Sequence, residues 1–136
     1  MSANRPVWSN GLTTLYATAP LADPKPARRH RASKAEWKQI RAEFKRSDCC
    51  CWTCPANWTE LHHILNRAHG GDDTVENLAP LCLSCHALIE ARDPVVRSLL
   101  RGALMPSNLA YLRYRIGENV GGWLERSYPL PKRVVG

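Results

Sequence analysis

The sequence lacks any apolar run long enough to cross a bilayer. Residues 78–89 are apolar but too few, and residues 6–22 are interrupted by polar residues and prolines. The first residues, Met1 to Pro6, contain none of the apolar stretch of a secretory signal. These absences argue against membrane insertion and secretion, and we predict a cytoplasmic protein.

Cysteine is too scarce for a disulfide scaffold. Six cysteines occur in 136 residues, below the roughly 8–10% that is typical of such proteins. In a reducing compartment, closely spaced cysteine pairs are more often metal ligands than disulfides. The chain also has no internal repeat and no low-complexity tract, and its length suits one domain with a modest core.

Positive charge is concentrated near the N-terminus. Residues 1–46 hold ten Lys and Arg against three Asp and Glu, whereas residues 47–136 hold nine of each. Proline-containing residues 1–32 have no sustained apolar period and are expected to form a basic, flexible arm, followed by one domain over residues 33–136. Such an arm suits a polyanionic partner or simply aids solubility. Its candidate DNA contacts are Arg28, Arg29 and Arg31.

A helix is predicted over residues 34–46. Ser33 and Glu36 fit a capping box, and Trp37, Ile40 and Phe44 recur at helical spacing. A basic strip lies beside this apolar stripe and comprises Lys34, Lys38, Arg41 and Lys45. The strip is either an ordinary solvated face or a surface that contacts the DNA backbone.

The motif core spans residues 49–92. It is predicted to contain a strand over residues 58–64, a turn-rich loop over 70–73, a second strand over 77–82 and a helix over 85–92 capped by Ser84.

Two helices are expected in the extension over residues 93–136. One begins at Asp93 and ends before Pro106, and the next is capped by Ser107 and stops at Gly121 and Gly122. The predicted buried stripe of the second helix is Leu109, Leu112, Ile116 and Val120. Trp123 and Tyr128 are interpreted as packing residues.

Two C-x-x-C pairs, Cys51 with Cys54 and Cys82 with Cys85, are separated by 27 residues and predict one structural zinc site. Cys50 also lies within reach of Cys54 in a looser pair, but we prefer Cys51. Cys49 and Cys50 are then packing or adventitious thiols.

The histidines need a separate account. His62 and His63 adjoin in a predicted strand, where neighbouring side chains point to opposite faces, so one is expected to face a metal and the other a substrate. His86 could supply a second metal ligand, leaving positions open for water and phosphate. His30 and His69 are interpreted as non-catalytic.

Taken together, residues 37–92 resemble the HNH endonucleases, in the zinc-knuckle branch common in phages and bacteria. The matching residues are Cys51, Cys54, Glu60 to Ile64, Gly70 to Asp72, Asn77, Leu78, Leu81, Cys82, Cys85 and His86. The resemblance implies an α+β fold, with a small ββα-metal core and a four-cysteine zinc site flanked by helices.

The resemblance also implies roles for individual residues. His62 and His86 stand at the positions of the catalytic-metal ligands, and His63 stands at the general-base position. Asn77 corresponds to a residue that braces the histidine-bearing loop and orients the base, and Glu60 is a candidate acceptor for a ligand histidine. The expected ion is divalent, namely Mg²⁺, Mn²⁺, Ni²⁺ or Zn²⁺.

The predicted function is hydrolysis of DNA phosphodiesters, by nicking or double-strand cleavage, to give 5′-phosphate and 3′-hydroxyl ends. Arg67 is either a phosphate contact or a solvated loop charge. Low sequence specificity is expected, and a role in phage DNA packaging beside terminase, in the host cytoplasm, is the preferred biological setting. The main alternative is a non-catalytic zinc module that binds DNA or protein. A non-nucleolytic hydrolase is a third possibility, and the oligomeric state is left open.

Overall fold

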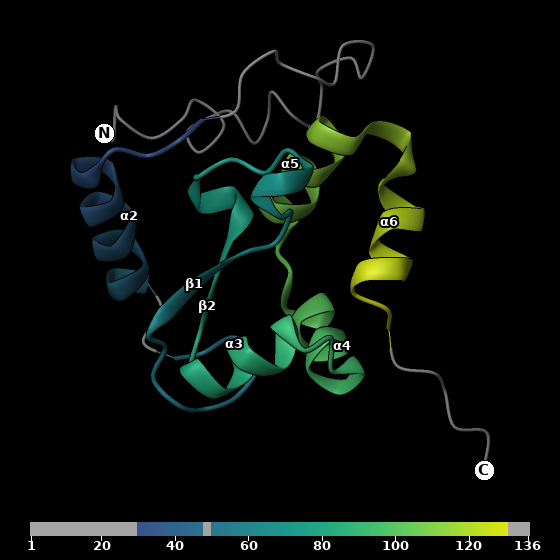
Figure 1. Ribbon diagram of the computed structural model, residues 1–136. Coiled ribbons are helices and arrows are strands. Elements are labelled where there is room, and N and C mark those ends of the chain that lie inside the picture. Colours follow the sequence, from purple (N-terminus) through teal and green to yellow (C-terminus); the bar gives the residue numbers. More distant parts are fainter. Residues whose placement is uncertain (1–29, 48–49, 131–136) are drawn as a thin grey trace.

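The computed structural model describes residues 30–47 and 50–130 (Figure 1). The elements in chain order are α2 (Lys34–Ser47), β1 (Glu60–His63), the 3₁₀ turns η3 (Arg67–His69) and η4 (Val75–Asn77), β2 (Leu78–Leu81), α3 (Leu83–Glu90), α4 (Pro94–Ala103), α5 (Pro106–Ile116), the 3₁₀ turn η5 (Gly117–Asn119) and α6 (Val120–Ser127). No helix within these ranges combines the length and the apolar character that a membrane span requires.

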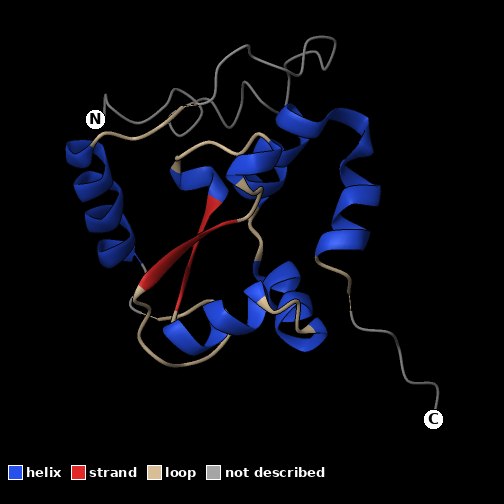
Figure 2. Cartoon of the chain, viewed as in Figure 1, coloured by secondary structure: helices blue, strands red, loops and turns tan. Residues whose placement is uncertain are grey.

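The centre of the fold is an antiparallel pair of short strands, β1 and β2 (Figure 2). Their register places His62 opposite Ala79 and His63 opposite Leu78. Helix α3 follows β2 and contacts both strands. This mixed arrangement of helices and a two-stranded sheet confirms the predicted α+β class, although each strand is shorter than the sequence pattern suggested.

Helix α2 covers one side of the strands through a small apolar cluster. Ile40 and Phe44 are buried and pack with Trp58 and Leu78. The predicted capping box is present, because the Ser33 hydroxyl accepts from the Glu36 N–H at 3.1 Å and the Glu36 carboxylate accepts from the Ser33 N–H at 2.8 Å. The helix therefore begins and packs as its sequence indicates.

A second, larger core joins the sheet to the C-terminal helices. Its buried members include Ile64, Leu81, Ile89, Leu100 and Leu112. Helices α4, α5 and α6 all contribute to this core, so the extension is continuous with the motif core rather than a separate unit.

The loop before η4 is tied to helix α5 by a buried carboxylate. Arg115 makes a two-pronged contact with Asp72, with Nε and Nη2 each 2.8 Å from a carboxylate oxygen. The Tyr111 hydroxyl donates to the same carboxylate at 2.6 Å. Gly71 is required here, since a Cβ would lie 1.8 Å from the Leu65 carbonyl oxygen. The loop is thus held by charge pairing and by a close backbone approach.

Two predicted helix caps are wrong. Helix α3 begins at Leu83, and its N-cap is Cys82, whose sulfur accepts from the Cys85 N–H, rather than Ser84. Helix α5 begins at Pro106, where the Asn108 side chain accepts from the Met105 N–H at 2.8 Å, so Ser107 is not its cap. Both capping side chains have a further partner, since Cys82 lies in a cluster of four cysteines and the Asn108 amide nitrogen donates to the Glu76 carbonyl.

The predicted stop at Gly121 and Gly122 is also wrong. Helix α5 ends at Ile116, and both glycines lie in the first turn of α6. The buried side chains of α5 are Asn108, Tyr111 and Leu112, whereas Leu109 is exposed. The polar residues Asn108 and Tyr111 belong to this buried face because they bond to the η4 segment and to Asp72, which an apolar pattern does not indicate.

Most of the predicted basic arm, including Arg28 and Arg29, lies outside the described residues. Its last residues contact the loop before η4. The His30 N–H donates to Asp72, the Ala32 N–H donates to Asp73 at 3.0 Å, and the Arg31 guanidinium donates to the Gly71 carbonyl at 2.8 Å. The segment leading into α2 is therefore attached to the domain.

Replacing Arg115 by Met should destabilise the fold strongly. Both charged side chains of the Arg115–Asp72 pair are nearly inaccessible to solvent, at 6% and 1%. Removing the cation leaves a buried carboxylate without its main partner, and the expected loss in free energy of unfolding is about 3–5 kcal/mol. Urea denaturation with zinc present would measure it. The matched control is Arg113→Met at an exposed position of the same helix, expected to change stability by less than about 0.5 kcal/mol. An unchanged unfolding midpoint in Arg115→Met would refute this role.

Candidate metal and catalytic site

Four cysteine sulfurs form one cluster. The Sγ atoms of Cys51, Cys54, Cys82 and Cys85 all lie within 4.8 Å of one another, and those of Cys54 and Cys82 are 3.6 Å apart. This is the donor set of a structural zinc site. Two of the ligands come from the turn before β1 and two from the junction of β2 and α3, so a bound ion would link the two halves of the motif.

The cluster settles which neighbouring cysteine belongs to it. Among the described residues it contains Cys51 and not Cys50. Burial opposes ionisation of Cys51, but hydrogen bonds from Thr53 and nearby backbone groups lower the pKa of its thiol to about 6. Burial raises the pKa of Cys85 to about 12. The two thiols differ in proton affinity, and at neutral pH metal binding would release a proton chiefly from Cys85.

A second cluster lies on the other side of β1 from His63. His62, His86 and Glu90 each offer one ligand atom, and these atoms lie within 4.8 Å of one another. The Glu90 carboxylate is 3.8 Å from His62 Nδ1 and 3.7 Å from His86 Nε2. Two imidazoles and a carboxylate fit a divalent ion of the borderline class. His86 and Glu90 share one face of α3 because they are four residues apart.

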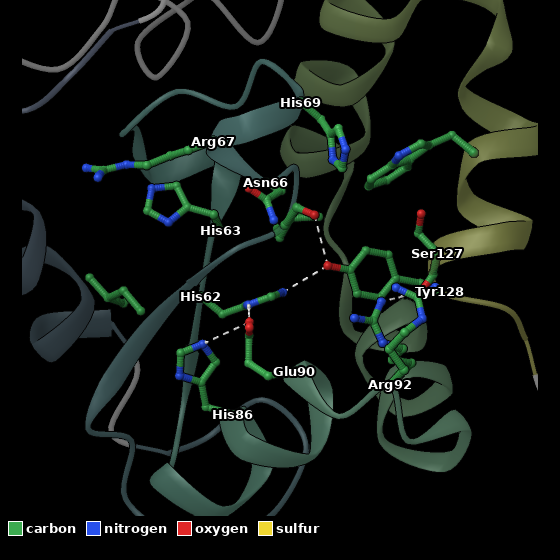
Figure 3. A pocket seen from close by; sticks show the side chains of 14 residues that line it. His62, His63, Asn66, Arg67, His69, His86, Glu90, Arg92, Ser127 and Tyr128 are labelled. Carbon is green, nitrogen blue, oxygen red and sulfur yellow. Dashed lines mark hydrogen bonds and ion pairs between the residues drawn. The ribbon is translucent and has the colours of Figure 1, made fainter.

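Each histidine of this cluster has a partner on its other ring nitrogen. His86 Nδ1 is 2.7 Å from Glu60 Oε1, as expected for the acceptor anticipated at Glu60. His62 Nε2 is 2.9 Å from the hydroxyl oxygen of Tyr128. In both cases the nitrogen nearer Glu90 is left to face the centre of the cluster (Figure 3).

The surroundings of His62 favour its neutral form. Burial is the largest cause that lowers the pKa of His62 to about 3, and electrostatic interactions with His86, Arg97 and His63 add to it. A neutral imidazole is the form that binds a metal. Burial also raises the pKa of Tyr128 to about 12, so its hydroxyl keeps its proton.

His63 points away from this cluster and toward Asp73. Its Nε2 lies 2.8 Å from Asp73 Oδ1, and its ring meets the edge of Trp37 in α2 with centroids 6.1 Å apart. Burial lowers the pKa of His63 below its ordinary value of 6.5, although Asp73 opposes the shift. This shift favours the neutral imidazole, the form that can accept a proton.

Asp73 is held as an anion by several donors. Burial opposes its ionisation, but hydrogen bonds from Arg67, the Ala32 N–H and His63 lower the pKa of Asp73 to about 2. Arg67 makes a two-pronged contact with it, at 3.0 Å from Nε and 2.6 Å from Nη2. An ionised carboxylate accepts only, so His63 Nε2 must be the donor.

Asn77 braces the loop that carries the histidines and does not line the cavity. Its side-chain oxygen accepts from the Leu65 N–H at 2.7 Å, and its amide nitrogen donates to the Leu65 and Asp72 carbonyls at 3.0 Å each. It is fully buried. These bonds hold the end of β1 against the loop that contains Asp73.

A cavity of about 470 Å³ opens over the histidines (Figure 3). His62, His63, His86 and Glu90 all line it, and so do Arg67 and His69 from η3. The remaining wall includes residues from the C-terminal helices and the segments that follow α3 and α6, namely Arg92, Arg97, Trp123, Ser127 and Tyr128. Side chains from both faces of β1 therefore line the same cavity.

The basic strip of α2 is on the helix that contacts His63, one of the residues lining the cavity. Lys34, Lys38, Arg41 and Lys45 are all exposed, and the same helix supplies Trp37, which contacts His63. Of the predicted DNA contacts in the arm, only Arg31 lies among the described residues. Its guanidinium donates to the Gly71 carbonyl and lies 3.7 Å from the Asp73 carboxylate.

Three residues of the site were missed from the sequence. Glu90 could have been found, because it lies one helical turn after His86. Asp73 stood in a segment interpreted only as a turn, and Tyr128 was interpreted as a packing residue. Neither of these has a local pattern that points to a histidine.

Comparison with known proteins gives one match. Residues 48–92 match the family model described as HNH endonuclease. Comparisons with curated proteins and with solved structures found no match. The matched stretch contains both cysteine pairs, His62, His63, His86 and Glu90, and it ends before the helices that complete the cavity.

The zinc content of two variants should show whether Cys51 or Cys50 is the zinc ligand. Cys51→Ser removes one sulfur from the four-sulfur cluster, so purified protein is expected to lose its tightly bound zinc, and its folded fraction should fall, because structural zinc contributes directly to folding. Cys50→Ser, at the adjacent position, should retain one zinc per chain. Elemental analysis of both variants after dialysis would check this. If only Cys50→Ser lost its zinc, then Cys50 and not Cys51 would be the zinc ligand.

Proposed function

We propose that the chain is a metal-dependent DNA endonuclease whose catalytic base is His63, on the premise that residues 48–92 match the HNH endonuclease family model. The observation that supports the proposal most directly is that the two adjacent histidines of β1 have different partners. His62 belongs to a three-residue ligand cluster with His86 and Glu90, His63 faces an ionised aspartate, and both histidines line one cavity.

His62, His86 and Glu90 are the residues that would hold the divalent ion. When bound, the ion would neutralise charge on the phosphate and stabilise the departing 3′-oxygen. Water would still have access, because the cavity over these residues is open and large enough for a phosphate group.

His63 would take the proton from the attacking water. Asp73 accepts from Nε2, which leaves Nδ1 as the basic atom and fixes the direction of the ring. Asp73 would also stabilise the imidazolium that forms as the proton is transferred. The products would be 5′-phosphate and 3′-hydroxyl ends.

The exposed strip of α2 is proposed to bind the DNA backbone next to this site. Lysine and arginine side chains at helical spacing suit successive phosphates, and contacts of this kind carry no sequence information. Low sequence specificity is part of the proposal, because helices α4 to α6 pack into the core of the same domain. A role in phage DNA packaging beside terminase is a further prediction from the family resemblance.

His63→Ala should abolish most cleavage while leaving zinc bound. Positioned general bases contribute about 10²–10⁴-fold to rate, so relaxation of supercoiled plasmid in Mg²⁺ or Mn²⁺ should slow by that factor. The control is His30→Ala, which removes an imidazole paired with Glu36 outside the cavity and should cut at the normal rate.

The same assay distinguishes the alternatives. Equal cutting by the wild type and His63→Ala would reject His63 as the base. A folded wild-type protein that cuts under none of the divalent ions, and binds only the zinc of the cysteine cluster, would instead be a zinc-dependent binding module.

Removing charge from α2 should weaken DNA binding in a salt-dependent way. The triple variant Lys38→Gln, Arg41→Gln, Lys45→Gln is expected to reduce the slope of log affinity against log salt by about 2.7, since each phosphate contact contributes about 0.9. Fluorescence anisotropy with a non-specific duplex would measure the slope. Arg113→Gln, at an exposed position of α5, should leave it unchanged. A triple variant with the wild-type slope would show that this strip is an ordinary solvated face.

A further inference from the structure

The hydroxyl of Tyr128 joins the end of the C-terminal extension to the metal-binding cluster. Its oxygen lies 2.9 Å from His62 Nε2 and also 2.9 Å from the Ile64 carbonyl oxygen. Tyr128 itself is almost fully buried, with 3% of its surface exposed. Tyr128 lies 36 residues beyond the matched stretch at 48–92.

The donor and acceptor capacities of these groups determine where the protons lie. A carbonyl oxygen only accepts, so the single hydroxyl proton of Tyr128 goes to Ile64. The hydroxyl oxygen must then accept from His62, which places the imidazole proton on Nε2. The lone pair of His62 is left on Nδ1, the nitrogen that lies 3.8 Å from Glu90.

We propose that Tyr128 is a positioning residue that holds His62 in the tautomer whose Nδ1 lone pair faces His86 and Glu90. The C-terminal extension thereby completes the metal site. This inference rests on the proposed function, because it assumes that the three-residue cluster binds a divalent ion. It assigns to Tyr128 the outer-acceptor role that Glu60 has for His86.

The tyrosine is itself held in place from several directions. Arg97 lies over its ring at 5.1 Å and donates to the Ser127 carbonyl at 2.6 Å. Arg101 donates to the Tyr128 carbonyl at 3.0 Å, and the Trp123 ring meets the tyrosine edge with centroids 5.7 Å apart. Arg97 also donates twice to the carbonyl of Ile89, the neighbour of Glu90. Tyr128 and the end of α3 therefore share one set of contacts.

Without the hydroxyl, both partners of Tyr128 change. A phenylalanine keeps the ring but leaves Ile64 without its donor and the Nε2 proton of His62 without an acceptor. The imidazole is then free to move its proton to Nδ1, the atom required for the ion. Losses of outer-shell partners of this type typically weaken metal binding by about 10–100-fold.

The test compares Tyr128→Phe with Tyr111→Phe. Tyr111 is equally buried and its hydroxyl bonds to Asp72, away from the ligand cluster, so its loss reports the stability cost of removing a buried hydroxyl. With the cysteine site filled by zinc and no DNA present, calorimetric titration with Mn²⁺ should give a dissociation constant about 10–100-fold higher for Tyr128→Phe than for the wild type. Tyr111→Phe should match the wild type.

A second measurement reads the tautomer directly. The ¹⁵N shifts of the His62 ring, before Mn²⁺ is added, should show a protonated Nε2 in the wild type and in Tyr111→Phe, and a mixture or the opposite tautomer in Tyr128→Phe. Equal Mn²⁺ affinity in both variants, or an unchanged His62 tautomer in Tyr128→Phe, would overturn this inference alone. A wild-type protein that takes up no second ion would overturn both this inference and the proposed function.

Discussion

Neighbouring side chains on a strand point to opposite faces, and the site depends on this constraint at one position. His62 and His63 leave β1 in different directions, so one imidazole joins His86 and Glu90 while the other meets Asp73. A shift of one residue in the register with β2 would exchange the two faces. The short strand pair therefore needs strong support from its surroundings.

That support comes from the loop between β1 and β2. Asn77 bonds to the backbone on both sides of the loop, and Gly71 allows the two segments to approach closely. Asp72 and Asp73 are adjacent buried carboxylates with separate tasks. Asp72 anchors helix α5 through Arg115, and Asp73 orients His63 with the help of Arg67. The loop between β1 and β2 therefore both anchors helix α5 and orients His63.

The two candidate metal clusters also have separate roles. The four cysteines lie in the turn before β1 and at the start of α3, so a bound zinc ion would link these segments and stabilise a domain whose described residues form only two short strands. The second cluster uses the same helix at His86, which directly follows Cys85, and at Glu90, one turn further along. Its histidines each bond to an outer partner, Glu60 in β1 for His86 and Tyr128 after α6 for His62.

Local patterns in the sequence were sufficient for the α+β class, the capped helix α2 and the two cysteine pairs, because helical periodicity and ligand spacing are short-range properties. They also marked three central histidines as candidates, and the structure places all three at one cavity. The caps of α3 and α5 and the boundary between α5 and α6 were wrong, since Cys82, Asn108 and Tyr111 take roles that depend on distant partners. Only the tertiary structure brought Asp73 to His63 and Tyr128 to His62. Tyr128 and His62 are 66 residues apart, and a hydrogen bond across that separation leaves no periodic signal in the chain.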